Sequence, residues 1–329
     1  MHFRPYSPAD LIALTALWNR IALAGEVVYR PLNETALNDK FFKGAQGGAR
    51  CFVAEDKKQI VGLIHGTVQT RYLPGETHEN TPGYLTVVLV APEYRRQNIG
   101  AALLAELEKT FIMEGKKRIT VSDRNPVQLA WIVPGTPGHE HNKAPGVDEA
   151  CVGFIFLQTQ GYKVSASEVA MYLPLDQYIP DVQLEERRSG LLSQGIETGY
   201  YNVSLQYDFD RMCDRVGSEY WRNVLQIETT AIHPRPILAA THDGYIVGFT
   251  GPVDLEPSGR GWFTGICTDP MYEKRGIATV LFNFLMQAFI TEGASYSTLF
   301  TGVENRAQHL YLRTGFRVVR RFAVMSKPL

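Results

Sequence analysis

The chain has 329 residues, more than one hydrophobic core usually serves, so two domains are expected. Hydrophobic residues make up 45% of it and charged residues 20%, as is typical of a soluble globular protein. The formal net charge of −1 argues against a broad basic surface, so we expect neither a nucleic acid nor a membrane as partner.

Cysteine spacing and apolar runs indicate the compartment. The four cysteines lie far apart without a C-x-x-C pair, so we expect reduced thiols: Cys51, Cys151, Cys213 and Cys267. The first residues contain no long apolar run of the kind found in signal peptides. The longest apolar stretches, such as 87–91, are too short to span a bilayer. A cytoplasmic protein is therefore expected.

The first half begins with a helix and continues with strands. Ser7 followed by Pro8 predicts a helix start, because serine is a good N-cap and proline is favoured at the first helical position. Two runs at 51–54 and 60–64, separated by a polar turn, predict a β-hairpin. A basic turn then precedes a helix that we expect over 101–113. This order predicts a mixed α/β domain.

The second half repeats the same order of elements. It has a predicted hairpin at 237–240 and 245–249 and a predicted helix at 279–291. The segments 89–104 and 267–282 share an apolar strand end, a Pro-x-Tyr step, a basic turn and an apolar helix. Such self-similarity predicts two copies of one domain.

The distances between corresponding residues locate an insertion. Pro92 and Pro270 are 178 positions apart, whereas Gly161 and Gly315 are 154 apart, so the first half carries 24 extra residues between these marks. A Pro-, Gly- and His-rich stretch at about 126–150 accounts for them.

We therefore expect three consecutive parts of the chain. They are an N-terminal domain over 1–175, which contains the insertion, a linker helix over 176–194, and a C-terminal domain over 195–329. The prolines near 174 and 180 mark the boundary, because proline interrupts regular structure.

A basic, glycine-containing turn between a strand and a helix can hold phosphate. Its successive backbone N–H groups point into one concavity, and the helix dipole adds positive potential. In the second half the N–H groups would come from Lys274, Arg275, Gly276, Ile277, Ala278 and Thr279. Gly276 would allow the backbone to approach the ligand closely.

The whole pattern resembles the signature of the GNAT acetyltransferases. The second half combines Pro-x-Tyr at 270–272, the basic turn, Gly276-Ile-Ala, Asn305, and Leu-Tyr-x-x-x-Gly-Phe at 310–316. The doubled layout is similar to that of mycothiol synthase and related tandem acetyltransferases. The resemblance implies two α/β domains, each with a mixed, mostly antiparallel, splayed sheet flanked by helices.

The resemblance also implies acetyl-CoA as co-substrate. Main-chain groups of one strand would bind the pantetheine arm, the turn would bind the pyrophosphate, and Asn305 would contribute. The second-half strand residues are Ile266, Cys267 and Thr268. The corresponding, weaker set in the first half is Val88, Leu89, Val90, Arg95, Arg96, Asn98, Gly100 and Ala101.

One tyrosine distinguishes the two halves. Tyr311 lies four residues before Gly315, at the place where the family carries a general acid, whereas Leu157 lies four residues before Gly161. A tyrosine hydroxyl has an unperturbed pKa near 10 and so keeps its proton at neutral pH. We therefore predict a catalytic C-terminal domain and a non-catalytic N-terminal one.

Several features stay open from sequence. Candidate bases for the acceptor amine are Asp269, Glu304, Glu228 and His233. The predicted acceptor is a primary amine of a small molecule or peptide, and the oligomeric state is not predicted. Glu273, where the family has Gln or Arg, motivates an alternative function as a non-catalytic acyl-CoA sensor.

The insertion contains His139, Glu140 and His141, but nothing nearby completes the three or four ligands of a zinc site. We therefore expect no metal.

Overall fold

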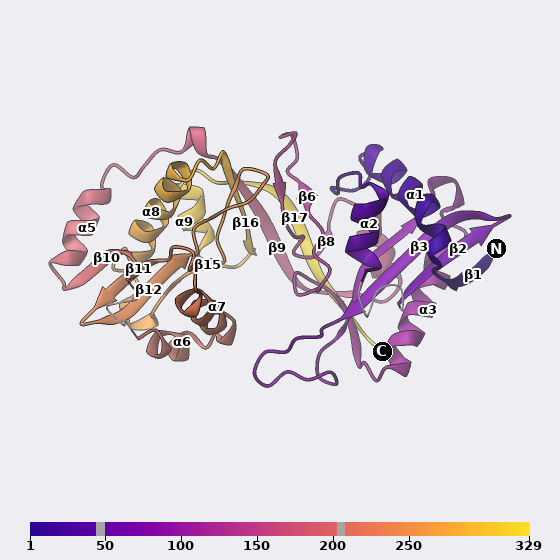
Figure 1. The fold of residues 1–329 in the computed structure, drawn as a ribbon, viewed down its shortest axis with the longest axis horizontal. Coiled ribbons are helices and arrows are strands. Elements are labelled where there is room, and N and C mark those ends of the chain that lie inside the picture. Colours follow the sequence, from indigo (N-terminus) through magenta and orange to yellow (C-terminus); the bar gives the residue numbers. More distant parts are fainter. Residues whose placement is uncertain (44–49, 203–207) are drawn as a thin grey trace. The chain divides into compact units, whose positions relative to one another are not determined.

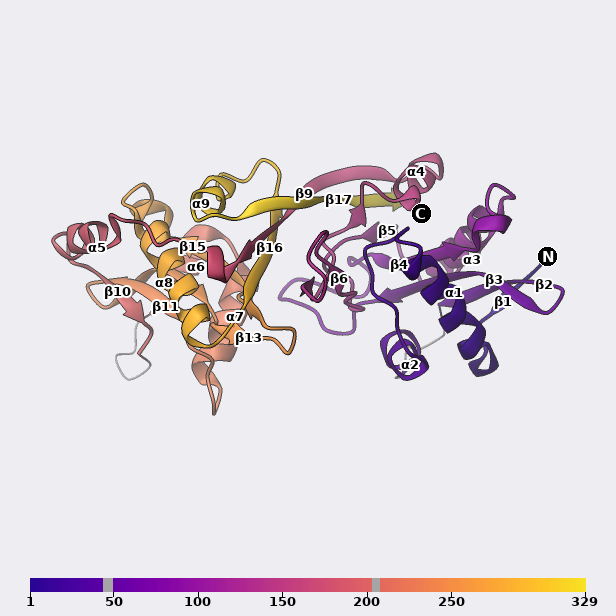
Figure 2. The same cartoon turned by 90° about the horizontal axis from the view of Figure 1, so that it is seen from above.

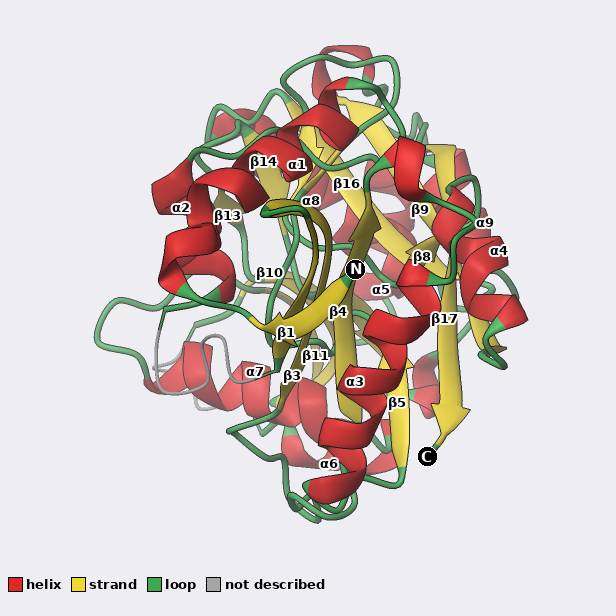
Figure 3. Cartoon of the chain, turned by 90° about the vertical axis from the view of Figure 1, so that its right-hand side faces the viewer, coloured by secondary structure: helices red, strands yellow, loops and turns green. Residues whose placement is uncertain are grey.

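The computed structural model describes residues 1–43, 50–202 and 208–329. The chain divides into two compact units (Figure 1). Unit 1 comprises Met1–Ala170 and Val319–Leu329, and unit 2 comprises Met171–Val318. Each unit has a mixed sheet flanked by helices, as the sequence predicted (Figure 3).

Unit 1 is built around a mixed sheet. Its helices are α1 (Leu11–Leu23), α2 (Glu34–Phe41), α3 (Ile99–Met113) and α4 (Val152–Thr159). Its strands are β1 (His2–Pro5), β2 (Cys51–Asp56), β3 (Gln59–Val68), β4 (Gly83–Val90), β5 (Arg118–Val121), β6 (Trp131–Ile132), β7 (Glu140–His141), β8 (Val147–Asp148), most of β9 (Lys163–Pro174) and most of β17 (Arg317–Pro328). The sheet order β1-β2-β3-β4-β5-β17-β9 is antiparallel from β1 to β4, parallel at β4–β5 and antiparallel at β5–β17.

Unit 2 repeats the arrangement of strands and helices. Its helices are α5 (Leu184–Leu192), α6 (Asp210–Val216), α7 (Glu219–Thr230), α8 (Ile277–Thr291) and α9 (Gln308–Arg313). Its strands are β10 (Ile196–Tyr200), β11 (Leu238–His242), β12 (Tyr245–Gly251), β13 (Asp254–Leu255), β14 (Arg260–Trp262), β15 (Gly265–Thr268) and β16 (Tyr296–Gly302). One sheet has the order β10-β11-β12-β15, while the end of β9, β16, β14 and β13 lie next to one another in that order.

Two glycines show the repeat in the packing. A Cβ at Gly83 would lie 2.7 Å from the ring of Phe111, and one at Gly261 would lie 2.5 Å from the ring of Phe289. These glycines and phenylalanines are each 178 positions apart, the same spacing as between the two prolines of the repeated motif. In both units a phenylalanine of the central helix therefore packs directly on strand backbone.

The C-terminal strand belongs to unit 1. β17 runs beside β9 (Figure 2) and pairs with β5 from Met325–Val121 to Pro328–Arg118. Phe322 is fully buried, and its ring lies 5.3 Å from that of Trp131. The sequence predicted one C-terminal domain over 195–329, whereas in the structure residues 319–329 belong to unit 1. Their buried apolar side chains complete the core of that unit.

The insertion forms part of unit 1. β6 pairs with β7, and the ring of His141 stacks on Trp131 with centroids 5.8 Å apart. Among the described residues, no group of three or more His, Cys, Asp or Glu could hold a metal ion. The four cysteines are free thiols. In the described ranges, no helix has the length and apolar character needed to cross a membrane.

Candidate functional site

In both units a strand separates from its parallel neighbour. In unit 1, β4 pairs with β3 along its whole length but with β5 only at Gly83–Ile119 and Tyr84–Thr120. In unit 2, β14 pairs with β16 at Arg260–Tyr296 and Gly261–Ser297, and the following strand β15 then pairs with β12. The main chain past each parting point has one unpaired edge, which can bind an extended ligand.

The turn that follows the splayed strand has the same backbone in both units. Arg96 and Asn98 have φ of 61° and 60°, and Lys274 and Gly276 have φ of 61° and 91°. Asn98 of unit 1 therefore has the left-handed backbone that Gly276 has in unit 2. Asparagine tolerates this left-handed conformation because its short polar side chain can hydrogen-bond locally.

Each turn presents six backbone N–H groups without an acceptor. Within the described parts of the chain, no N–H from 96 to 101 or from 274 to 279 donates a hydrogen bond. The last three of each set open α3 or α8, where the helix dipole is positive. A Cβ at Gly276 would meet no atom within 4 Å, so the space beside this residue of the turn is open. Both turns are suited to bind a phosphate.

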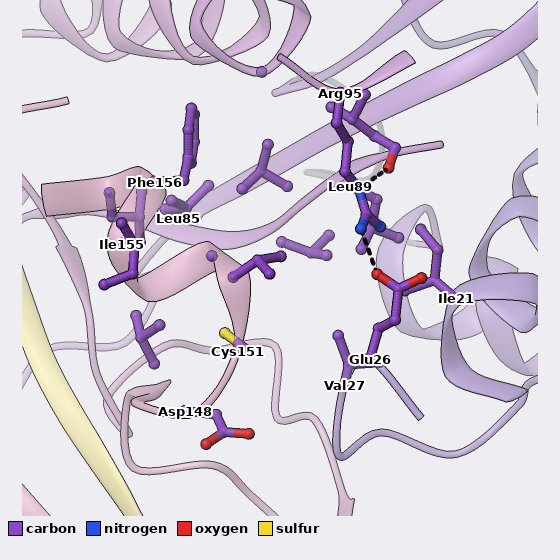
Figure 4. Close-up of a pocket in the computed structure, with 18 of the residues that line it drawn as sticks. Ile21, Glu26, Val27, Leu85, Leu89, Arg95, Asp148, Cys151, Ile155 and Phe156 are labelled. Carbon is purple, nitrogen blue, oxygen red and sulfur yellow. Dashed lines mark hydrogen bonds and ion pairs between the residues drawn. The ribbon is translucent and has the colours of Figure 1, made fainter. Parts of the chain in front are cut away.

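A cavity of about 730 Å³ adjoins the splayed strand of unit 1 (Figure 4). It is bordered by 85–90 of β4, by the turn, by 146–148 of the insertion and by α4. The structure brings all the predicted first-half residues to this cavity: Val88, Leu89, Val90, Arg95, Arg96, Asn98, Gly100 and Ala101. The contribution of 146–148 was not predicted, because these residues lie far from the motif along the chain.

Both carboxylates of this cavity are already engaged. Arg95 donates to the carbonyl of Val90 at 3.0 Å and to the carboxylate of Glu26 at 2.5 Å (Figure 4). Asp148 is buried and accepts hydrogen bonds from Arg320 at 2.8 Å and from the N–H of Ala150 at 3.0 Å. The guanidinium of Arg95 thus points to its own unit's main chain and Glu26.

The predicted residues of unit 2 occupy corresponding elements. Ile266, Cys267 and Thr268 form most of β15, and residues 274–279 form the turn and the start of α8. Asn305 is exposed, and its side-chain oxygen accepts the N–H of Ala307 at 2.9 Å. Its side chain therefore caps the local turn before α9.

Tyr311 lies on α9 with a buried ring and a free hydroxyl. The ring centroid is 5.1 Å from that of Phe282 and 6.3 Å from that of Phe316. Its hydroxyl has no hydrogen-bond partner among the described residues, and it is not one of the fully buried side-chain atoms that lack a partner. Burial raises the pKa of Tyr311 to about 12, so the phenol is neutral at physiological pH. Leu157 lies at the corresponding place and borders the unit 1 cavity.

The four candidate bases differ in their surroundings. Asp269 is buried, caps the following turn through the N–H of Met271 at 2.9 Å, and pairs with Arg215 at 2.6 Å. Glu228 is buried in an ion pair with Arg235. The other two, Glu304 and His233, are exposed.

Sequence reasoning did not identify how α7 approaches the splayed strands. The hydroxyl of Tyr220 lies 3.0 Å from that of Thr264, which is between β14 and β15. A Cβ at Gly265 would lie 3.2 Å from the indole nitrogen of Trp221. The adjacent aromatic residues Tyr220 and Trp221 were the signal in the sequence that could have pointed to this helix.

Comparison with known proteins agrees with this geometry. The sequence model described as the acetyltransferase (GNAT) family matches residues 15–131 and 202–316. A search of curated proteins gave no match.

Solved structures give the same fold at low identity. A GCN5-related glucosamine N-acetyltransferase region of a fungal multi-domain GH3 β-N-acetylglucosaminidase is 16% identical with a TM-score of 0.70, and the match covers 99% of this chain and 38% of that one. A GCN5-related N-acetyltransferase from Sphaerobacter thermophilus is 17% identical with a TM-score of 0.64, covering 99% and 95%. A tandem GNAT protein from the clavulanic acid biosynthesis pathway is 15% identical with a TM-score of 0.56, covering 99% and 98%. At these identities the likeness shows the fold alone.

The family match spans most of the chain and occurs once in each half, on the elements that carry the splayed strand and the turn. The chain therefore belongs to the GNAT acetyltransferase family, and it contains two copies of the family's domain.

Proposed function

We propose that the chain is an acetyl-CoA-dependent N-acetyltransferase that acetylates a primary amine of a small molecule or peptide, and that unit 2 performs the transfer. The observation that carries the proposal is the difference between Tyr311 and Leu157. Unit 2 has a phenol whose hydroxyl has no partner in the described ranges, whereas unit 1 has an aliphatic side chain at the same place. Both units have the turn with its row of N–H groups open to a ligand.

Unit 2 residues have distinct tasks in this proposal. When bound, acetyl-CoA supplies an activated acyl carbon and a thiol leaving group. The N–H groups of 274–279 hold its pyrophosphate, and the unpaired edge of β15 orients its arm. The Tyr311 hydroxyl donates its proton to the departing sulfur, because a phenol with a pKa of about 12 is fully protonated at neutral pH.

Tyr311 gives its proton to the sulfur, and the proton that the amine nitrogen loses when the amide forms returns through solvent to the Tyr311 phenolate, so Tyr311 ends the cycle protonated. The buried candidates Asp269 and Glu228 are held in ion pairs, and we assign no side chain as base. The amine attacks in its neutral form.

The test measures release of free CoA thiol with a panel of amines. Glucosamine belongs in the panel because one similar structure is described as a glucosamine N-acetyltransferase region. We expect release with at least one amine, and we expect Gly276→Glu to abolish it. The added side chain would extend into the open space beside Gly276 and place a negative charge at the turn.

Gly293→Glu is the matched control. Gly293 has φ of 85° and open space around it like Gly276, but it lies just past the other end of α8. This variant shares the strain and the charge and leaves the turn intact. Binding of acetyl-CoA without thiol release for any amine would favour the alternative function of a non-catalytic acyl-CoA sensor, for which Glu273 in the turn is the motivating feature.

A further inference from the structure

The two units carry side chains of different size around Tyr311 and Leu157, where the thioester of a bound CoA would lie. In unit 2 the ring of Phe282 lies 5.8 Å from that of Phe263, 5.1 Å from that of Tyr311 and 5.8 Å from that of Phe316. The repeat spacings of 178 and 154 align Phe263, Phe282, Tyr311 and Phe316, in that order, with Leu85, Leu104, Leu157 and Tyr162 of unit 1. At three of these four positions unit 1 thus has a leucine where unit 2 has an aromatic residue.

Two of these leucines, Leu85 and Leu157, lie at the unit 1 cavity, and Leu104 is buried in the core. Val87 also borders this cavity of about 730 Å³, where unit 2 has Gly265. In unit 2 the indole of Trp221 packs against Gly265, since a Cβ added at this glycine would lie only 3.2 Å from the indole nitrogen. At the positions that correspond to Leu85, Val87 and Leu157, unit 2 therefore has Phe263, the Trp221 indole against Gly265, and Tyr311, all of them aromatic.

The acidic and phenolic groups at the open region of unit 1 are neutral or paired. Asp148 is held by Arg320 and by a backbone N–H. Burial raises the pKa of the Cys151 thiol and of the Tyr29 phenol, so both are neutral at physiological pH. Such a lining stabilises hydrocarbon and disfavours a protonated amine.

We infer that unit 1 binds CoA thioesters whose acyl group is a hydrocarbon chain longer than acetyl, and that it holds them without transferring the chain. This inference rests on the proposed function for the turn of unit 1. The larger, apolar end accepts the chain, and Leu157 offers no proton to a leaving thiol. Each buried methylene should tighten binding about fourfold. Hexanoyl-CoA, with four more methylenes, should thus bind unit 1 about 250-fold more tightly than acetyl-CoA.

The first experiment is calorimetry on the full chain carrying Gly276→Glu, which is expected to abolish CoA binding at the turn of unit 2. The probes are acetyl-, butyryl- and hexanoyl-CoA. We expect affinity to rise with each added pair of methylenes. Equal affinities, affinities that fall with length, or no binding at all would overturn the inference. Thiol release by the unsubstituted chain is measured separately, so failure here leaves the proposed transfer in unit 2 intact.

The second experiment restores the rings of unit 2 in unit 1. Leu157→Phe and Leu85→Phe, each in the Gly276→Glu background, should lower hexanoyl-CoA affinity to the level of acetyl-CoA. Leu312→Phe is the control, since Leu312 is half exposed on α9 of unit 2. Thermal unfolding verifies that each variant is folded. Two substitutions are used so that the test remains possible if one of the variants does not fold. Unchanged hexanoyl-CoA affinity in a folded filled variant would refute the assignment of the acyl end.

Discussion

Two phenylalanines six residues apart should stabilise different units. Phe322 on β17 is fully buried in unit 1, 5.3 Å from the ring of Trp131. Phe316 is 2% exposed and packs in unit 2 on Phe282 and Tyr311. Truncating a buried phenylalanine to alanine costs about 3–5 kcal/mol, because apolar contact is lost and a cavity remains. Phe322→Ala should therefore destabilise unit 1 by this amount, and Phe316→Ala should destabilise unit 2 by a similar amount.

Native-state hydrogen exchange, resolved by peptide, measures both effects in one protein. Phe322→Ala should lower the opening free energy of the amides in α3 and leave those in α8 unchanged. Phe316→Ala should do the reverse, which makes each variant the control of the other. If both variants accelerate exchange only in α8, β17 stabilises unit 2, and the placement of the C-terminal strand is refuted.

Three further predictions concern unit 1. Asn98→Asp keeps a residue that tolerates left-handed backbone but adds a negative charge at the turn, so CoA thioester affinity of unit 1 should fall roughly 10- to 100-fold by calorimetry; unchanged affinity would move the site elsewhere. His65 is 2% exposed, its Nε2 lies 3.0 Å from the carbonyl oxygen of Phe41, and burial lowers its pKa to about 4. Between pH 7 and pH 4.5 the unfolded chain therefore binds a proton at this histidine, while the folded chain mostly does not. The free energy of unfolding should fall by about 2–3 kcal/mol over this range. Denaturant titrations should show a smaller fall for His65→Gln, and an equal fall would exclude His65 as the cause. Arg320→Met leaves the buried Asp148 without its cation. Because Arg320 is partly exposed, we expect the free energy of unfolding of unit 1 to fall by only roughly 1–3 kcal/mol in the same titrations. A stability equal to that of the native chain would contradict this prediction.

Local signals made much of the fold predictable. The basic turn, its glycine or asparagine, and the repeat spacing are features of neighbouring residues, and the structure has the turn at the predicted place in both halves, with left-handed backbone at Asn98 and Gly276. The predicted order of strands and helices in each half also agrees with the structure, because hairpin turns and helix caps depend on neighbouring residues.

Long-range pairing could not be predicted in this way. The partner of β17 is about 200 residues away, at Val121, and an apolar strand pattern does not say which sheet edge it joins. The same holds for Asp148, whose placement at the cavity depends on Arg320 of that strand. The roles of Tyr311 and Asn305 stay predictions, although the side chain of Asn305 is engaged with the N–H of Ala307.

The most direct test of the proposed mechanism is steady-state kinetics of Tyr311→Phe with an accepted amine. The substitution keeps the ring that packs on Phe282 and removes only the hydroxyl, so stability should hardly change. Loss of a positioned general acid typically lowers the rate about 10²- to 10⁴-fold, and we predict that fall in kcat with little change in the KM for acetyl-CoA. Tyr296→Phe is the control, because it removes a buried hydroxyl of the same unit that donates to Ser258 at 3.1 Å, and its kcat should stay near that of the native chain. A Tyr311→Phe enzyme with near-native kcat would contradict the assignment of the general acid and the choice of unit 2 that rests on it.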